Sequence, residues 1–195
     1  MAKRPATIYQ LKVTLKHIRP QIWRRLYVSS DTKLDELHLV LQDALGWNNS
    51  HLHQFRVGER LIGIKEDDDA FLDELEDETR IKLSQIAVEK SRFVYEYDFG
   101  DDWDHEIVVE TVLAAVDGVR YPVCTAGKRA CPPDDCGGPG GYHRLLAALA
   151  DAEHKEHDRM LEWVGGPFDP EAFDLEDTNI VMRSAQRPRC WTRLN

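Results

Sequence analysis

The chain has 195 residues, of which 42% are apolar and 31% are charged. This composition can support one sizeable core, so we expect a single domain over residues 1–195 with its core at about 7–183. No run approaches the roughly 18 apolar residues that cross a bilayer, and the first residues lack the apolar stretch of a secretory signal. We therefore expect a cytoplasmic protein without a membrane partner.

The net charge of −10 is concentrated in one segment. Nine of the thirteen residues from Glu66 to Glu78 are acidic and none is basic. Like charges repel, and the four apolar residues among them offer little surface to bury. We expect this acidic insert (66–78) to be an exposed loop with a helical turn.

The first half of the chain predicts strands around one helix. Residues 11–15 alternate apolar and polar side chains, and residues 22–28 resume as a second strand after a proline break, which predicts an N-terminal antiparallel hairpin. Four leucines at helical spacing predict one long helix over 33–45, packed on the sheet: Leu34, Leu37, Leu41 and Leu45. Two strands should follow, at 51–57 and near 60–64.

The second half predicts a hairpin, an irregular loop and several helices. Residues 93–97 and 105–115 form the hairpin, turned at 99–103, after residues 81–86 return to the body. Three prolines and four glycines make residues 131–141 irregular. Helices at 142–150, 154–164 and 170–183 make the C-terminal part helical. Strands, a helix, strands and then helices indicate an α+β domain with a mixed or antiparallel sheet.

Three cysteines make zinc a candidate cofactor. Cys124, Cys131 and Cys136 lie within thirteen residues. In a reducing compartment, clustered thiols bind metal more often than they pair, and structural zinc takes four nitrogen or sulfur ligands. His105 is our first choice for the fourth ligand and His143 the second. The alternative is that proline and glycine alone make the loop rigid.

Four carboxylates and a histidine crowd residues 98–105. Asp98, Asp101 and Asp102 with His105 would suit Mg²⁺ or Mn²⁺ and metal-assisted hydrolysis. Aspartate and glycine are also ordinary turn residues, which explains the acids but not Trp103 and His105. The sequence lacks a nucleophile elbow, a phosphate loop and a dinucleotide fingerprint, so these motifs assign no reaction.

A few further residues are candidates for a binding surface. His51 and His53 share a face if they lie in a strand, where they could hold a metal or, when protonated, an anion. Arg24 and Arg25 make the first hairpin basic, although the net acidic charge argues against a nucleic-acid partner. Trp103 completes this set.

Several segments together resemble one family. They include Arg19-Pro20-Gln21-Ile22-Trp23-Arg24-Arg25, Tyr97-Asp98-Phe99-Gly100-Asp101-Asp102-Trp103 and Cys131-Pro132-Pro133-Asp134-Asp135-Cys136-Gly137-Gly138. From roughly Tyr9 to Asn179 the chain resembles the plasmid pRiA4b ORF-3-like family, also described as transposon-passenger TnpR-like proteins. The resemblance implies a single α+β domain with a mixed sheet, an association with plasmids and mobile elements, and no assigned reaction.

Two functions from different classes are therefore open. The first is a non-catalytic accessory or binding domain whose Cys-Pro-Pro loop acts as a structural clamp, with zinc as its staple if the cysteines bind metal. The second is a metal-dependent, hydrolase-like enzyme that uses the 98–105 turn. We favour the first. In both, we expect the 98–105 turn and the 124–136 loop to lie side by side. Clustered carboxylates repel one another unless cations or N–H donors meet them, and the loop loses backbone entropy without gaining sheet hydrogen bonds, so each segment is more stable packed against the other.

Overall fold

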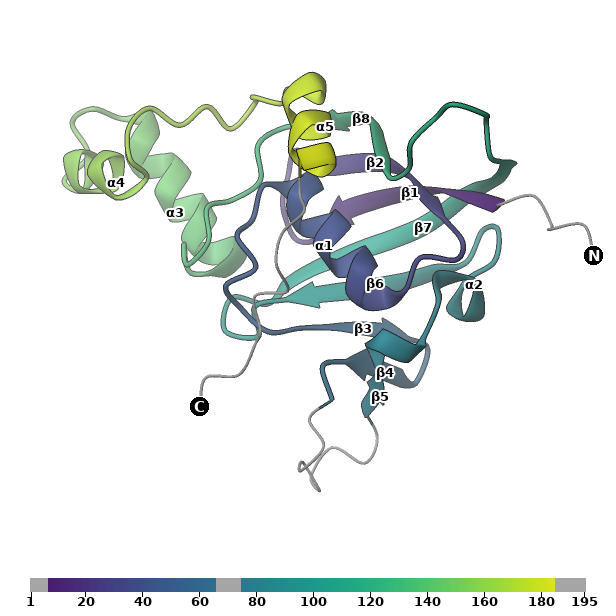
Figure 1. The fold of residues 1–195 in the computed structure, drawn as a ribbon. Coiled ribbons are helices and arrows are strands. Elements are labelled where there is room, and N and C mark those ends of the chain that lie inside the picture. The colour runs from purple at the N-terminus through teal and green to yellow at the C-terminus, as the bar shows by residue number, and fades with distance from the viewer. Residues whose placement is uncertain (1–6, 66–74, 185–195) are drawn as a thin grey trace, which may run out of the picture.

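The computed structural model describes residues 7–65 and 75–184, which form one mixed sheet with helices (Figure 1). Eight strands in these ranges follow the order β5-β4-β3-β6-β7-β1-β2-β8, antiparallel except for the pair β4–β5. Their bounds are β1 Thr7–Leu15, β2 Trp23–Ser29, β3 His53–Val57, β4 Arg60–Gly63, β5 Leu75–Asp77, β6 Arg92–Tyr97, β7 Trp103–Ala114 and β8 Val123–Lys128. The expected α+β class, mixed sheet and N-terminal hairpin are confirmed.

The helices gather on one face and at one end of the sheet. They are α1 Leu34–Leu45, α2 Leu83–Ile86, α3 Gly138–Ala150, α4 His157–Trp163 and α5 Leu175–Ser184, with a 3₁₀ turn η1 at Glu78–Arg80. Figure 1 shows α1 across one sheet face with α5 beside it, whereas α3 and α4 extend beyond the strands. None of the helices in the described ranges has both the length and the apolarity to cross a bilayer.

Helix α1 forms because its apolar side chains recur on one face. Leu34, Leu37 and Leu41 are completely buried, and Gly46 ends the helix in the left-handed conformation at φ 82°. At 12 residues α1 is one residue shorter than α3, so it is not the one long helix that we expected.

The acidic insert is only partly a loop. Residues 66–74 lie outside the described ranges, but Leu75–Asp77 form β5, which pairs in parallel with β4. An ion pair between Arg60 and Glu76, 2.6 Å from Nε to Oε1, offsets charge at this edge. Glu78 is buried and its Oε2 lies 2.8 Å from Nε2 of His53. The last four residues of the insert therefore belong to the folded body.

Buried polar groups hold α1 on the sheet. The Tyr95 hydroxyl lies 2.8 Å from Nδ1 of His38 and accepts a hydrogen bond from Nε2 of Gln42 at 3.0 Å. The rings of His38 and His53 stack at 3.5 Å. Burial lowers the pKa of His38 to about 3 and that of His53 to about 4, and it raises the pKa of Glu78 to about 7. His53 is thus a neutral core residue and cannot serve as a surface site.

We expect Leu41→Ala to lower the free energy of unfolding by about 2–5 kcal/mol, because it leaves a cavity under α1. Urea denaturation checks this, with Val88→Ala as the control. Val88 is 68% exposed, so its truncation should cost less than about 0.5 kcal/mol. Equal losses in the two variants would show that α1 does not bury this face.

Candidate functional site

The Cys-Pro-Pro loop (Cys131–Gly137) lies against two segments that are distant in sequence. Nε1 of Trp47 donates a hydrogen bond to the Pro132 carbonyl at 2.8 Å, and the Ser50 hydroxyl donates to Asp134 at 3.3 Å. On its other side, the backbone N–H of Gly137 donates to Oδ2 of Asp101 at 3.0 Å. The structure therefore brings the 98–105 turn and the loop together, as expected.

Glycines permit this close approach. Gly138 has φ +66°, and a Cβ there would lie 2.6 Å from the Asp101 carbonyl oxygen. A Cβ on Gly141 would lie 1.8 Å from the carbonyl oxygen of Cys136. Both positions exclude any larger residue while the backbone keeps this path.

His51, Asp98 and Asp135 form the one group of at least three potential metal ligands found in the described ranges. Nε2 of His51 lies 3.2 Å from Oδ1 of Asp135 and 3.6 Å from Oδ2 of Asp98. All three ligand atoms lie within 4.8 Å of one another. That Nε2 is buried, yet it makes no hydrogen bond to any described group. We call these three residues the His51 cluster.

The turn fixes the Asp98 carboxylate before any ligand arrives. Asp98 has a left-handed φ of 59°, and its backbone N–H donates to the Leu52 carbonyl at 2.9 Å. Its Oδ1 accepts hydrogen bonds from the backbone N–H groups of Gly100 at 3.0 Å and Asp101 at 3.3 Å. This occupies one carboxylate oxygen and leaves Oδ2 directed toward His51.

The spacing of the His51 cluster fits a divalent cation. Two ligands bound to one ion at about 2.0–2.2 Å in a tetrahedron lie roughly 3.3–3.6 Å apart. Of the two separations from Nε2 of His51, 3.6 Å lies at the upper end of this range and 3.2 Å lies just below it. One imidazole with two carboxylates suits Mn²⁺ or Zn²⁺, which accept both nitrogen and oxygen ligands.

The other acids and the histidine of the turn do not join this cluster. Asp101 binds the Gly137 backbone, and Asp102 is exposed at φ 54°. His105 is completely buried, with its ring 5.0 Å from that of Trp47 and its Nδ1 donating to the Tyr95 carbonyl at 3.2 Å. Burial lowers the pKa of His105 to about 4. Of the four residues expected to act together in an enzyme, only Asp98 reaches the cluster.

Two of the three cysteines contact groups that are not metal ligands. Sγ of Cys124 donates to the Ala126 carbonyl at 3.5 Å, and Sγ of Cys131 lies 3.7 Å from Nη2 of Arg24. No three of Cys124, Cys131, Cys136 and His105 bring ligand atoms within 4.8 Å of one another. Burial raises the pKa of all three thiols, that of Cys136 to about 12, so they are protonated at neutral pH. His143 is exposed on α3.

Two more of the expected surface residues are buried. Arg24 is 4% exposed and donates to the carbonyls of Ala44 and Lys128. Trp103 is completely buried. Arg25 faces outward, stacks over the Trp23 ring at 5.3 Å and pairs with Glu110 at 2.6 Å. Of the two arginines that make the first hairpin basic, Arg24 is therefore buried in the fold, and Arg25, which faces outward, is already paired with Glu110.

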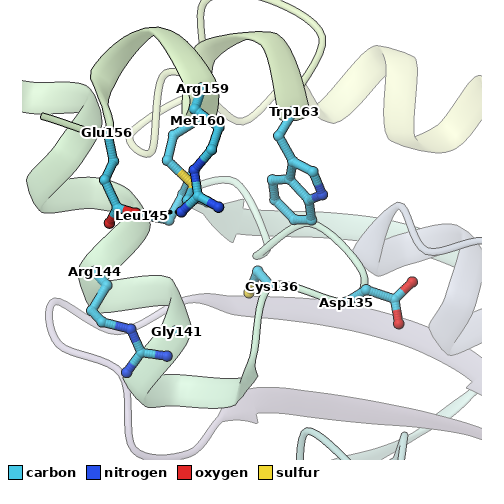
Figure 2. A pocket seen from close by; sticks show the side chains of 9 residues that line it. All are labelled: Asp135, Cys136, Gly141, Arg144, Leu145, Glu156, Arg159, Met160 and Trp163. Carbon is cyan, nitrogen blue, oxygen red and sulfur yellow. Dashed lines mark hydrogen bonds and ion pairs between the residues drawn. The ribbon is translucent and has the colours of Figure 1, made fainter.

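A cavity of about 440 Å³ opens beside the Cys-Pro-Pro loop (Figure 2). The loop, α3, the residue before α4 and α4 line it with Asp135, Cys136, Gly141, Arg144, Leu145, Glu156, Arg159, Met160 and Trp163. Asp135 therefore belongs both to the His51 cluster and to the rim of this cavity. The sequence named Asp135 only as part of a motif, since nothing in the spacing shows that the loop reaches His51.

These features define an α+β protein in which a docked loop completes a candidate cation site. Residues 7–177 match the model of the Plasmid pRiA4b ORF-3-like protein family, and the chain belongs to this family. It is 40% identical over 177 residues to "Uncharacterized protein y4hQ" of Sinorhizobium fredii, covering 89% of this chain and 90% of the relative.

A crystal structure from Methanosarcina mazei Go1, that of the "Protein of Unknown Function MM3350", is similar with a TM-score of 0.81 and 40% identity. The similarity covers 88% of this chain and 97% of that one. These names assign no activity, so function must be argued from the site.

We expect stability to fall as the pH drops from about 6.5 toward 4, partly through His105. The unfolded chain takes up a proton at His105 near pH 6.5, whereas the folded protein does so only near 4. Between pH 7 and 4.5 this one residue should contribute about 2–3 kcal/mol to the loss. Urea denaturation at both pH values should show a smaller loss for His105→Gln and an unchanged loss for the exposed His143→Gln. Equal pH dependence in all three proteins would contradict the assignment.

Proposed function

We propose that the protein is a divalent-cation-dependent binding module, in which the His51 cluster holds Mn²⁺ or Zn²⁺ and clamps the Cys-Pro-Pro loop to the body. The observation that carries the proposal is the buried Nε2 of His51, which lies between two carboxylate oxygens without a hydrogen bond. A cation would satisfy this nitrogen and neutralise Asp98 and Asp135 together. The clamp of the first hypothesis is retained, but its staple moves from the cysteines to this cluster.

The three ligands come from three segments that must be held together. His51 precedes β3, Asp98 follows β6 and Asp135 lies in the loop. The Asp135 side chain is 71% exposed, whereas those of His51 and Asp98 are 25% and 11% exposed. The body therefore supplies two fixed ligands, and the loop supplies the third from the solvent side. Cation binding should accordingly order the loop more than the sheet.

A metal-dependent hydrolase is the second candidate, and one observation favours it. Three protein ligands leave coordination positions for water or substrate, as in catalytic zinc sites, and Asp135 also lines a cavity. This candidate does not use His105 as a metal ligand, because that residue is completely buried outside the His51 cluster, nor the protonated Cys136 as a nucleophile. The description TnpR-like suggests a resolvase, an enzyme of DNA recombination. The proposal does not include that activity, because the serine nucleophile and the basic DNA-binding helices of a resolvase are not evident in the sequence.

We expect the wild-type protein, after chelation and dialysis, to bind one Mn²⁺ or Zn²⁺ per chain in isothermal titration calorimetry. At a cation concentration of 100 Kd, binding to the folded state should add about 2.7 kcal/mol of stability. His51→Ala and Asp98→Asn should each weaken binding at least tenfold. Asp102→Asn is the matched control, since it changes an acid of the same turn that lies outside the cluster.

Two further variants separate the competing sites. Cys124→Ser/Cys131→Ser should leave cation affinity unchanged, whereas a thiolate zinc site would lose it. Cation-dependent turnover of 4-nitrophenyl phosphate or 4-nitrophenyl acetate that disappears in His51→Ala would favour the hydrolase. Equal cation affinity in wild type and His51→Ala would refute the proposed site.

A further inference from the structure

One guanidinium at the cavity beside the loop has no ionic partner among the described residues. The formal charges of the cavity are Arg144, Arg159, Glu156 and Asp135. Glu156 pairs with Arg159 across one helical turn, whereas the Asp135 carboxylate is directed toward His51 and away from both arginines (Figure 2). Arg144 makes no hydrogen bond or ion pair with any residue in the described ranges. The Arg144 guanidinium can therefore accept an anion in the cavity.

The opposite wall of the cavity is apolar and aromatic. Trp163 is 47% exposed, and Met160 and Leu145 line the space beside it. Figure 2 shows the Trp163 indole extending from α4 toward Cys136, with Met160 to its left beside Arg159. An exposed indole at the rim of a cavity gives a planar ligand a face on which to stack. The volume of about 440 Å³ lies within the roughly 300–1,000 Å³ of small-molecule sites.

We propose that this cavity binds a small aromatic oxyanion, a carboxylate or a phosphate monoester, with its anionic group on Arg144 and its ring against Trp163 and Met160. The planar guanidinium fork matches the two oxygens of either group. Glu156 already occupies Arg159, so Arg144 is the main determinant. This goes beyond the proposed cation site and depends on it only for the coupling described next.

Asp135 couples the cavity to the His51 cluster. In Figure 2 its carboxylate points away from both arginines, whereas its backbone continues directly into Cys136 at the cavity floor. A cation held by Asp135 removes a negative charge from the rim and fixes the loop. Both effects favour an anion in the cavity. By thermodynamic reciprocity, the anion must then strengthen cation binding by the same factor.

The test titrates the protein with phenyl phosphate and with benzoate, following amide shifts by NMR, with Zn²⁺ at saturation and without it. We expect both probes to bind the wild type, with Kd at least fivefold lower when Zn²⁺ is present. Arg144→Gln and Trp163→Ala should each raise Kd at least tenfold. Arg183→Gln is the matched control, because Arg183 is an exposed arginine on α5 that lies outside the cavity.

Uncharged and non-aromatic probes complete the test. Benzyl alcohol and inorganic phosphate should each bind at least tenfold more weakly than phenyl phosphate. Binding that survives both Arg144→Gln and Trp163→Ala, or failure of both aromatic anions to bind, overturns the inference. An unchanged Kd with Zn²⁺ overturns the coupling alone. Failure of the proposed cation site would be recognised separately, because isothermal titration calorimetry would then detect no binding of Zn²⁺ to the wild type.

Discussion

The docking of the Cys-Pro-Pro loop is the constraint on which the candidate site depends. The loop lies outside the sheet, so other segments bind its backbone: Trp47 at the Pro132 carbonyl and Asp101 at the Gly137 N–H. Gly138 permits the final approach, because a Cβ would collide with the Asp101 backbone. Without this docking Asp135 would not reach His51, and α3 would not begin at the position that closes the cavity.

Burial and charge divide the polar residues into two groups with different roles. His38, His53 and His105 lie in the core with lowered pKa values, so they are neutral and fix how helix and strands pack. Burying these imidazoles costs desolvation free energy. Hydrogen bonds to Tyr95 partly offset that cost for His38 and His105. His51, Asp98 and Asp135 lie beyond the ends of the inner strands β3 and β6, where a cation can enter from the solvent. The proposed cation site is therefore placed where one of its ligands, Asp135, remains open to solvent.

Local patterns predicted most of the fold. The leucine spacing of α1, the hairpins β1–β2 and β6–β7 and the irregular loop all depend on neighbours in sequence. Strand β5 was missed because nine carboxylates dominate a segment whose last residues pair with β4. Glu78 is buried only because it meets His53, which a charge count cannot reveal. The burial of Arg24 did have a signal, since the period of two puts it on the face of Leu26 and Val28.

The candidate site was predictable in part. The sequence placed the turn beside the loop, and it selected His51 and Asp98 separately, but it joined Asp98 to His105 instead of Asp135. His105 alternates onto the buried face of β7, whereas the contact between His51 and Asp135 depends on a loop whose path no periodicity encodes. The cysteine spacing predicted a zinc site, but no three of Cys124, Cys131, Cys136 and His105 bring ligand atoms within 4.8 Å of one another.

The most direct measurement is a crystal structure of the protein soaked in Mn²⁺, with anomalous diffraction data collected near the manganese edge. An anomalous peak about 2.0–2.2 Å from Nε2 of His51, Oδ2 of Asp98 and Oδ1 of Asp135 is the result that the proposed site requires. A peak at the cysteines, or none within reach of His51 at saturating Mn²⁺, would contradict it.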